Sequence, residues 1–68
     1  MYTIRLYNAP NDQVQVRVFR GPEAISTIVL RKDQGLIKAA LANYPSNTKV
    51  FATEKLPGSI RSLENMFN

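Results

Sequence analysis

Residues 2–20 decide the fold, and they read YTIRLYNAPNDQVQVRVFR. Apolar and polar residues alternate on both sides of a central break, and the apolar set is Tyr2, Ile4, Leu6, Val14, Val16 and Val18. A period of two, carried by β-branched and aromatic residues, is typical of a half-buried β-strand. The break contains Pro10, Asn11 and Asp12, which are residues that favour turns. The stretch therefore predicts an antiparallel hairpin with strands at 2–7 and 13–20 and a loop at 8–12.

The next segment fits two structures. Gly21 and Pro22 end the hairpin, and residues 24–30 are rich in β-branched side chains, which favours a third strand. Pro22 and Glu23 would also suit the first turn of a helix, whose apolar face would hold Ile25, Ile28 and Val29. We favour the strand and keep the helix as the alternative.

The second half of the chain predicts two helices and a short strand. Asp33 is a good N-cap for a helix at about 34–43, and Pro45 stops it. The helix carries an apolar stripe at Leu36, Ile37, Ala40, Leu41 and Tyr44. Residues 49–53 predict a strand with Val50 and Ala52 on one face. Ser59 is a possible N-cap for a short C-terminal helix at about 59–67.

This order of elements predicts a single small globular domain over residues 1–68, of the α+β class. We expect a two-layer sandwich in which an antiparallel sheet of three or four strands carries its helices on one face. The other face of the sheet would then be wet, and a binding function would be sought there or at a sheet edge.

Composition restricts the chemistry. The chain has no histidine and no cysteine, so it lacks the usual general base, thiol nucleophiles, disulfides and thiolate metal sites. Its five acidic residues are scattered, and no pair of them is suggested by spacing. We therefore predict a protein that is not an enzyme, with no catalytic residues, no cofactor and no metal. A domain this small often needs a second subunit for stability, so a homodimer and a monomer both remain open.

Hydropathy and net charge indicate the cellular compartment and the kind of partner. No apolar run approaches the length of a membrane span and no signal peptide is evident, so we predict a cytoplasmic protein without membrane contact. The net charge of +4 suits either simple solubility or attraction to nucleic acid or to an acidic protein surface.

The candidate partner-binding residues lie on the polar side of the hairpin. We predict a contact set of Arg5, Tyr7, Arg17 and Phe19, with Arg31 and Lys32 as an electrostatic rim. Arginine and tyrosine are common in protein-binding hot spots and can also stack on bases and contact phosphates. A merely solvated face with cross-strand pairs is the alternative.

The hypothesis is a small basic binding protein that covers a surface of a protein or nucleoprotein complex, in the manner of a phage or mobile-element inhibitor of host machinery. That comparison rests on size and architecture alone. Direct DNA or RNA binding by the same face is the first alternative. An oligomeric structural or assembly subunit, for example of a virion, is the second.

Overall fold

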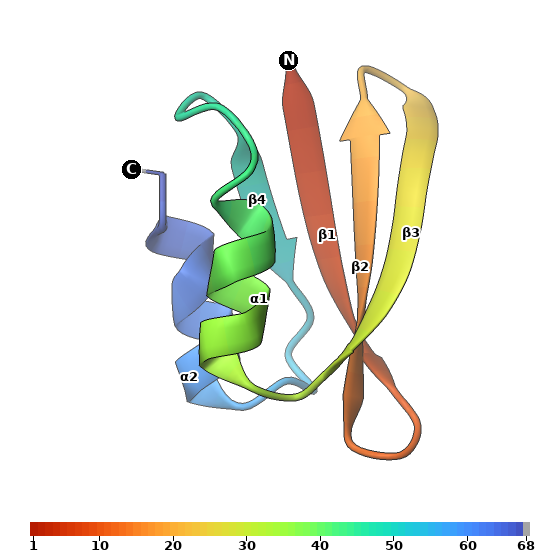
Figure 1. The fold of residues 1–68 in the computed structure, drawn as a ribbon, viewed down its shortest axis with the longest axis vertical. Coiled ribbons are helices and arrows are strands. Elements are labelled where there is room, and N and C mark those ends of the chain that lie inside the picture. Colours follow the sequence, from red (N-terminus) through yellow and green to blue (C-terminus); the bar gives the residue numbers. More distant parts are fainter. Residues whose placement is uncertain (68) are drawn as a thin grey trace.

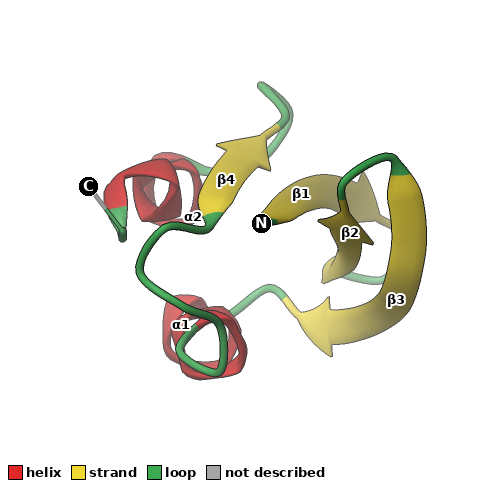
Figure 2. Cartoon of the chain, turned by 90° about the horizontal axis from the view of Figure 1, so that it is seen from above, coloured by secondary structure: helices red, strands yellow, loops and turns green. Residues whose placement is uncertain are grey.

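The computed structural model describes residues 1–67 and shows a small α+β fold, as predicted (Figure 1). Within these residues, the elements in chain order are β1 (Tyr2–Ala9), β2 (Gln13–Arg20), β3 (Glu23–Arg31), α1 (Gln34–Leu41), β4 (Lys49–Ala52), α2 (Gly58–Arg61) and the 3-10 helix η1 (Ser62–Asn65). The helices lie together at one side of the sheet, and β3 lies at the opposite side of the molecule (Figure 2).

The four strands form one sheet in the order β3-β2-β1-β4. The pairs β1–β2 and β2–β3 are antiparallel, but β4 runs parallel to β1, with Ile4 opposite Val50. The prediction of an antiparallel sheet is therefore correct for three strands and wrong for the fourth. The cause is the connection through α1, which returns the chain to the end of the sheet where β3 began, so β4 runs in the same direction as β3. Because β1 and β3 are both antiparallel to β2, β4 is also parallel to β1.

The N-terminal hairpin is confirmed, and β1 extends two residues beyond the predicted end, to Ala9. The turn is correspondingly tighter, and Asn11 and Asp12 have positive φ angles of 62° and 58°. Asparagine and aspartate tolerate this left-handed conformation better than most residues do. Residues 23–31 form a strand and not a helix, because Gly21, with φ of 60°, turns the chain directly back along β2.

Both helices are shorter than predicted. Asp33 does cap α1, since its Oδ1 accepts the N–H of Leu36 at 3.1 Å, but the helix ends at Leu41 and the Leu36 side chain is exposed. At the C-terminus, the expected helix at 59–67 divides into α2 and η1, and Ser59 is not its cap because the N-cap position belongs to Pro57. The Ser59 carbonyl instead accepts a hydrogen bond from the Gln34 side chain at 2.7 Å, which ties α1 to α2.

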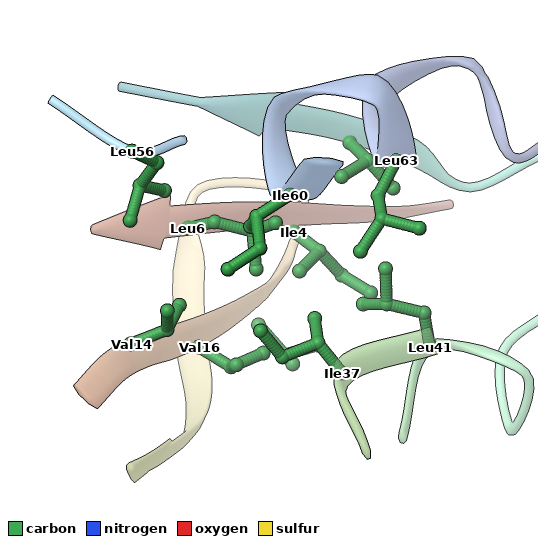
Figure 3. Close-up of a cluster of buried hydrophobic side chains, with 11 residues drawn as sticks. Ile4, Leu6, Val14, Val16, Ile37, Leu41, Leu56, Ile60 and Leu63 are labelled. Carbon is green, nitrogen blue, oxygen red and sulfur yellow. The ribbon is translucent and has the colours of Figure 1, made fainter. Parts of the chain in front are cut away.

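The core lies between the sheet and the helices (Figure 3). Its buried side chains are Ile4, Leu6, Val14, Val16, Val18, Ile37, Leu41, Val50, Leu56, Ile60 and Leu63. All the strand residues in this set have even numbers, so the alternation predicted for the hairpin defines the inner face of the sheet. Full burial of one such side chain contributes about 1.5–3 kcal/mol. Within residues 1–67, no helix is long and apolar enough to cross a membrane.

Candidate functional site

The face of the sheet that points away from the core is the candidate site, and we call it the outer face. Its members across the four strands are Thr3, Arg5, Tyr7, Gln15, Arg17, Phe19, Thr27, Val29, Arg31, Lys49 and Phe51. The odd-numbered positions of β1, β2 and β4 fall here, as do those of β3 from Thr27 onward, because side chains alternate between the two faces of a sheet. The bulge near the start of β3 reverses this parity, so Glu23 pairs with Arg20 on the other face. The predicted contact residues Arg5, Tyr7, Arg17 and Phe19 are all on this face, so the strand alternation brings them together.

Two arginines stand directly opposite each other at the centre of the outer face. Arg5 of β1 pairs with Arg17 of β2, and both side chains are exposed. Each guanidinium lies over an aromatic ring: Arg5 is 5.1 Å from the ring centroid of Phe51, and Arg17 is 5.6 Å from that of Tyr7. Facing like charges destabilise a sheet, whereas a cation over a ring contributes about 0.5–1 kcal/mol at an exposed site. The rings therefore hold in place two cations that would otherwise only repel.

Phe51 and Lys49 belong to the outer face, although the predicted contact set did not include them. The strand β4 lies beside β1, with Phe51 opposite Arg5 and Lys49 opposite Thr3. Phe51 remains 44% exposed, although phenylalanine is among the residue types most often buried. The sequence did contain this information, because a strand with Val50 and Ala52 on its core side has Lys49 and Phe51 on its other side. What the sequence did not show was that β4 pairs with β1.

The described strands contribute no carboxylate to the outer face, and acidic groups occur only at its margins. Asp33 lies 3.8 Å from Arg31 in an exposed ion pair at one end. Glu54 follows β4 and shares an open depression with Tyr7 and Lys55. The centre of the face therefore carries positive charge that no side chain of the face neutralises.

The hollows that include outer-face residues are open and not enclosed, and the two larger ones, of about 310 and 480 Å³, lie toward the β4 side of the face. A hollow of about 90 Å³ lies at the Arg5–Phe51 stack, and its lining includes Tyr7 and Thr53. Pockets for small organic ligands are usually about 300–1,000 Å³ and mostly enclosed. A hollow of about 90 Å³ has room for a single protruding group, such as a carboxylate or a phosphate.

The two predicted rim residues have different roles. Arg31 lies on the outer face at the edge strand, as the alternation of β3 requires. Lys32 is instead turned toward the hairpin, where its Nζ donates to Asn8 Oδ1 at 2.8 Å and lies 3.9 Å from Asp12. Its side chain is only 20% exposed. An internal contact therefore engages the charge of Lys32, and its role as a rim residue stays a prediction.

Other kinds of site lack a comparable cluster in the described part of the chain. Among residues 1–67, no three His, Cys, Asp or Glu side chains come close enough together to hold a metal ion. The outer face is thus the place where aromatic and cationic groups are most concentrated, and its geometry suits the recognition of an anionic surface. Comparison with protein-family models, curated proteins and solved structures finds no match to this chain.

Proposed function

We propose that this chain is a non-enzymatic binding protein whose outer face covers an acidic surface of a protein partner. The observation that carries the proposal is the pair of opposed arginines, Arg5 and Arg17, in a face without carboxylates. A stable sheet has no need of two facing cations, and replacing either would relieve the repulsion. A local arrangement that costs stability is expected where function requires it.

The stacked arginines suit carboxylate recognition. A guanidinium binds a carboxylate through two parallel hydrogen bonds, and a ring beneath it reduces the freedom that binding must remove. Arginine and aromatic residues together are also the usual centres of protein interfaces. The positive face would attract an acidic partner over a distance and then exclude other molecules from the covered surface. An inhibitor of the phage or mobile-element kind would act by this steric route.

Single-stranded nucleic acid is the second candidate partner. The outer face combines three aromatic rings with four cations, which are the groups that stack on bases and contact phosphates. However, the guanidinium groups of Arg5 and Arg17 lie over the rings of Phe51 and Tyr7. Bases would have to displace these cations in order to stack on the covered ring faces, so the geometry favours the protein partner.

The test uses a charge-matched pair of variants. Arg17→Gln removes one stacked arginine from the outer face, and Arg20→Gln removes another that lies 6.0 Å from Tyr2, on the helix side of the sheet. We expect capture of a protein partner from the native host to fall about tenfold or more with Arg17→Gln and to be unchanged with Arg20→Gln. Equal capture by the wild-type chain and by a folded Arg5→Ala, Arg17→Ala double variant would eliminate this surface.

A second measurement separates the two kinds of partner. A fluorescent oligothymidylate is titrated with the purified chain at 50 mM and at 200 mM salt. If the four cations of the outer face contact phosphates, affinity falls by about fiftyfold between these conditions, because bound counterions are released. Tight binding with this salt dependence would favour nucleic acid over a protein as the partner. No binding of the oligothymidylate at 50 mM salt would rule out single-stranded nucleic acid.

A further inference from the structure

The two edges of the sheet differ in whether other parts of the chain cover their outward backbone N–H and C=O groups. The β4 edge is only four residues long, and the N–H of Ala52 on its outer side donates to the Glu64 carboxylate at 2.8 Å. The C-terminal helices lie along this edge (Figure 1). The β3 edge is nine residues long, and no strand within residues 1–67 pairs with its outer side. Figure 2 shows β3 at the end of the sheet, on the side opposite β4 and α2. Within residues 1–67, the β3 edge is therefore the one that is open to another strand.

The hydrogen-bond pattern shows which backbone groups face outward. The Lys32 N–H donates to the Asp12 carbonyl at 2.8 Å, which fixes where β3 bonds to β2. Because bonded and non-bonded pairs alternate in an antiparallel ladder, Ile28 and Leu30 also bond toward β2. The N–H and C=O groups of Thr27 and Val29 then point away from the sheet. They form a regular row that a further strand can bond.

The side chains along this edge leave it unprotected. The stretch from Ala24 to Leu30 contains no charged residue and no proline, and it is rich in β-branched residues. Ile25, Ile28 and Val29 are 45%, 42% and 47% exposed. Natural edge strands are usually blunted by lysine, proline, bulges or short length. The one irregularity is a bulge near the start of β3, at the register shift opposite Val18 and Phe19, and the pairing beyond it is regular.

We propose that the β3 edge pairs antiparallel with the β3 edge of a second copy of this chain. The argument for self-pairing is the charge at the two ends of the strand, which is negative at Glu23 and positive at Arg31. Antiparallel pairing of two copies brings the acidic end of each strand beside the basic end of the other. Parallel pairing would bring like charges together, which is destabilising. A two-fold axis also closes the assembly at two copies.

The consequence is one continuous sheet made from two four-stranded sheets. The apolar middle of each β3 strand is covered by that of the other, which removes exposed β-branched surface from water. The two outer faces become neighbours on the same side of the joined sheet. This inference does not depend on the proposed function, because it rests on the edge of the sheet and not on the arginines of its face.

The experiment measures molar mass across a dilution series by light scattering or sedimentation equilibrium. We expect twice the 7.7 kDa chain mass at high concentration. Val29→Lys places a charge on the open edge and raises the Kd of dimerisation by about a hundredfold, since symmetry makes the change count twice. Leu36→Lys is the matched control, because Leu36 is an apolar residue of similar exposure, 42%, that belongs to α1 and not to the β3 strand. That variant remains dimeric.

Amide hydrogen exchange supplies an independent readout. The N–H groups of Thr27 and Val29 point outward, so they exchange slowly in the dimer and rapidly at dilutions where the chain is monomeric. The N–H of Ile28 bonds to β2 and stays protected in both states. A chain that is monomeric at every concentration would overturn the proposal. A dimer that survives Val29→Lys, or that leaves Thr27 and Val29 unprotected, would overturn it as well, because the contact would lie elsewhere.

Discussion

Glu64→Ala tests whether one carboxylate closes the β4 edge. Glu64 Oε2 accepts the Ala52 N–H at 2.8 Å in a partly buried position, and the alanine variant leaves that N–H without this acceptor. A hydrogen bond to a charged group contributes about 1.5–3 kcal/mol. For a 68-residue chain with a total stability of roughly 3–10 kcal/mol, that is a large fraction. At roughly 4–8 °C per kcal/mol, we expect the Tm to fall by about 6–24 °C.

Thermal and urea unfolding followed by circular dichroism measure this loss. Glu64→Gln keeps an acceptor oxygen without the charge, and we expect it to lose about half as much, because charge-assisted bonds are roughly twice as strong as neutral ones. Glu54→Ala is the control, since it removes a carboxylate from an exposed turn. The Ala52 amide should also exchange faster in the Glu64→Ala variant. A free energy of unfolding within about 0.5 kcal/mol of wild type would refute the reasoning.

The same variant has an effect on assembly. In the part of the wild-type chain that the structure describes, only the β3 edge is open, so the proposed pairing through it stops at two copies. Opening the β4 edge as well would give each copy two places for strand pairing. Chains with two open edges can associate without closure. We therefore expect Glu64→Ala to form species larger than a dimer at concentrations where the wild-type chain does not.

The remaining predictions concern the stability contributed by a core residue, a turn glycine and a helix cap. Ile37→Ala leaves a cavity beneath α1 and should cost about 2–5 kcal/mol in urea unfolding, whereas Leu36→Ala on the exposed side of the same helix should change stability by less than about 1 kcal/mol. Gly21→Ala should cost about 1–2 kcal/mol, because Gly21 has a φ of 60°, which an alanine rarely adopts. No atom lies within 4 Å of the new Cβ, so the cost comes from the backbone alone, and an unchanged Tm would show that the turn changes its conformation at no cost. Asp33→Ala removes the α1 cap and should cost about 1 kcal/mol, and Asp33→Asn should restore most of it.

The sequence predicts best where a pattern is local. Alternation in residues 2–20 gives both faces of the hairpin, and it places Arg5 and Arg17 on the same side without any knowledge of the rest of the fold. Asp33 is likewise identified as a cap from its own position before an apolar stripe. Both conclusions depend on backbone geometry within a few residues, which the amino-acid types control directly.

The sequence predicts less where distant segments meet. Residues 24–30 fit both a strand and a helix because Ile25, Ile28 and Val29 do not alternate with polar residues, and the structure shows why: β3 is an edge strand with exposed apolar residues on both faces. Phe51 joins the candidate site only because β4 crosses to the far side of β1. Lys32 contacts Asn8 and Asp12, which no local pattern in the sequence indicates. These contacts depend on topology, which local periodicity does not encode.

The parallel pairing of β1 with β4 also sets an order of assembly during synthesis. The strands β1, β2 and β3 follow one another through tight turns, so their pairing requires only short loops to close. The partner of β1 on its other side is made later, because residues 32–48 separate β3 from β4. Until then β1, which ends as an interior strand, has one vacant side. We expect a nascent chain that stops before Lys49 to expose this side, so the period before β4 emerges is when wrong partners can most easily bind.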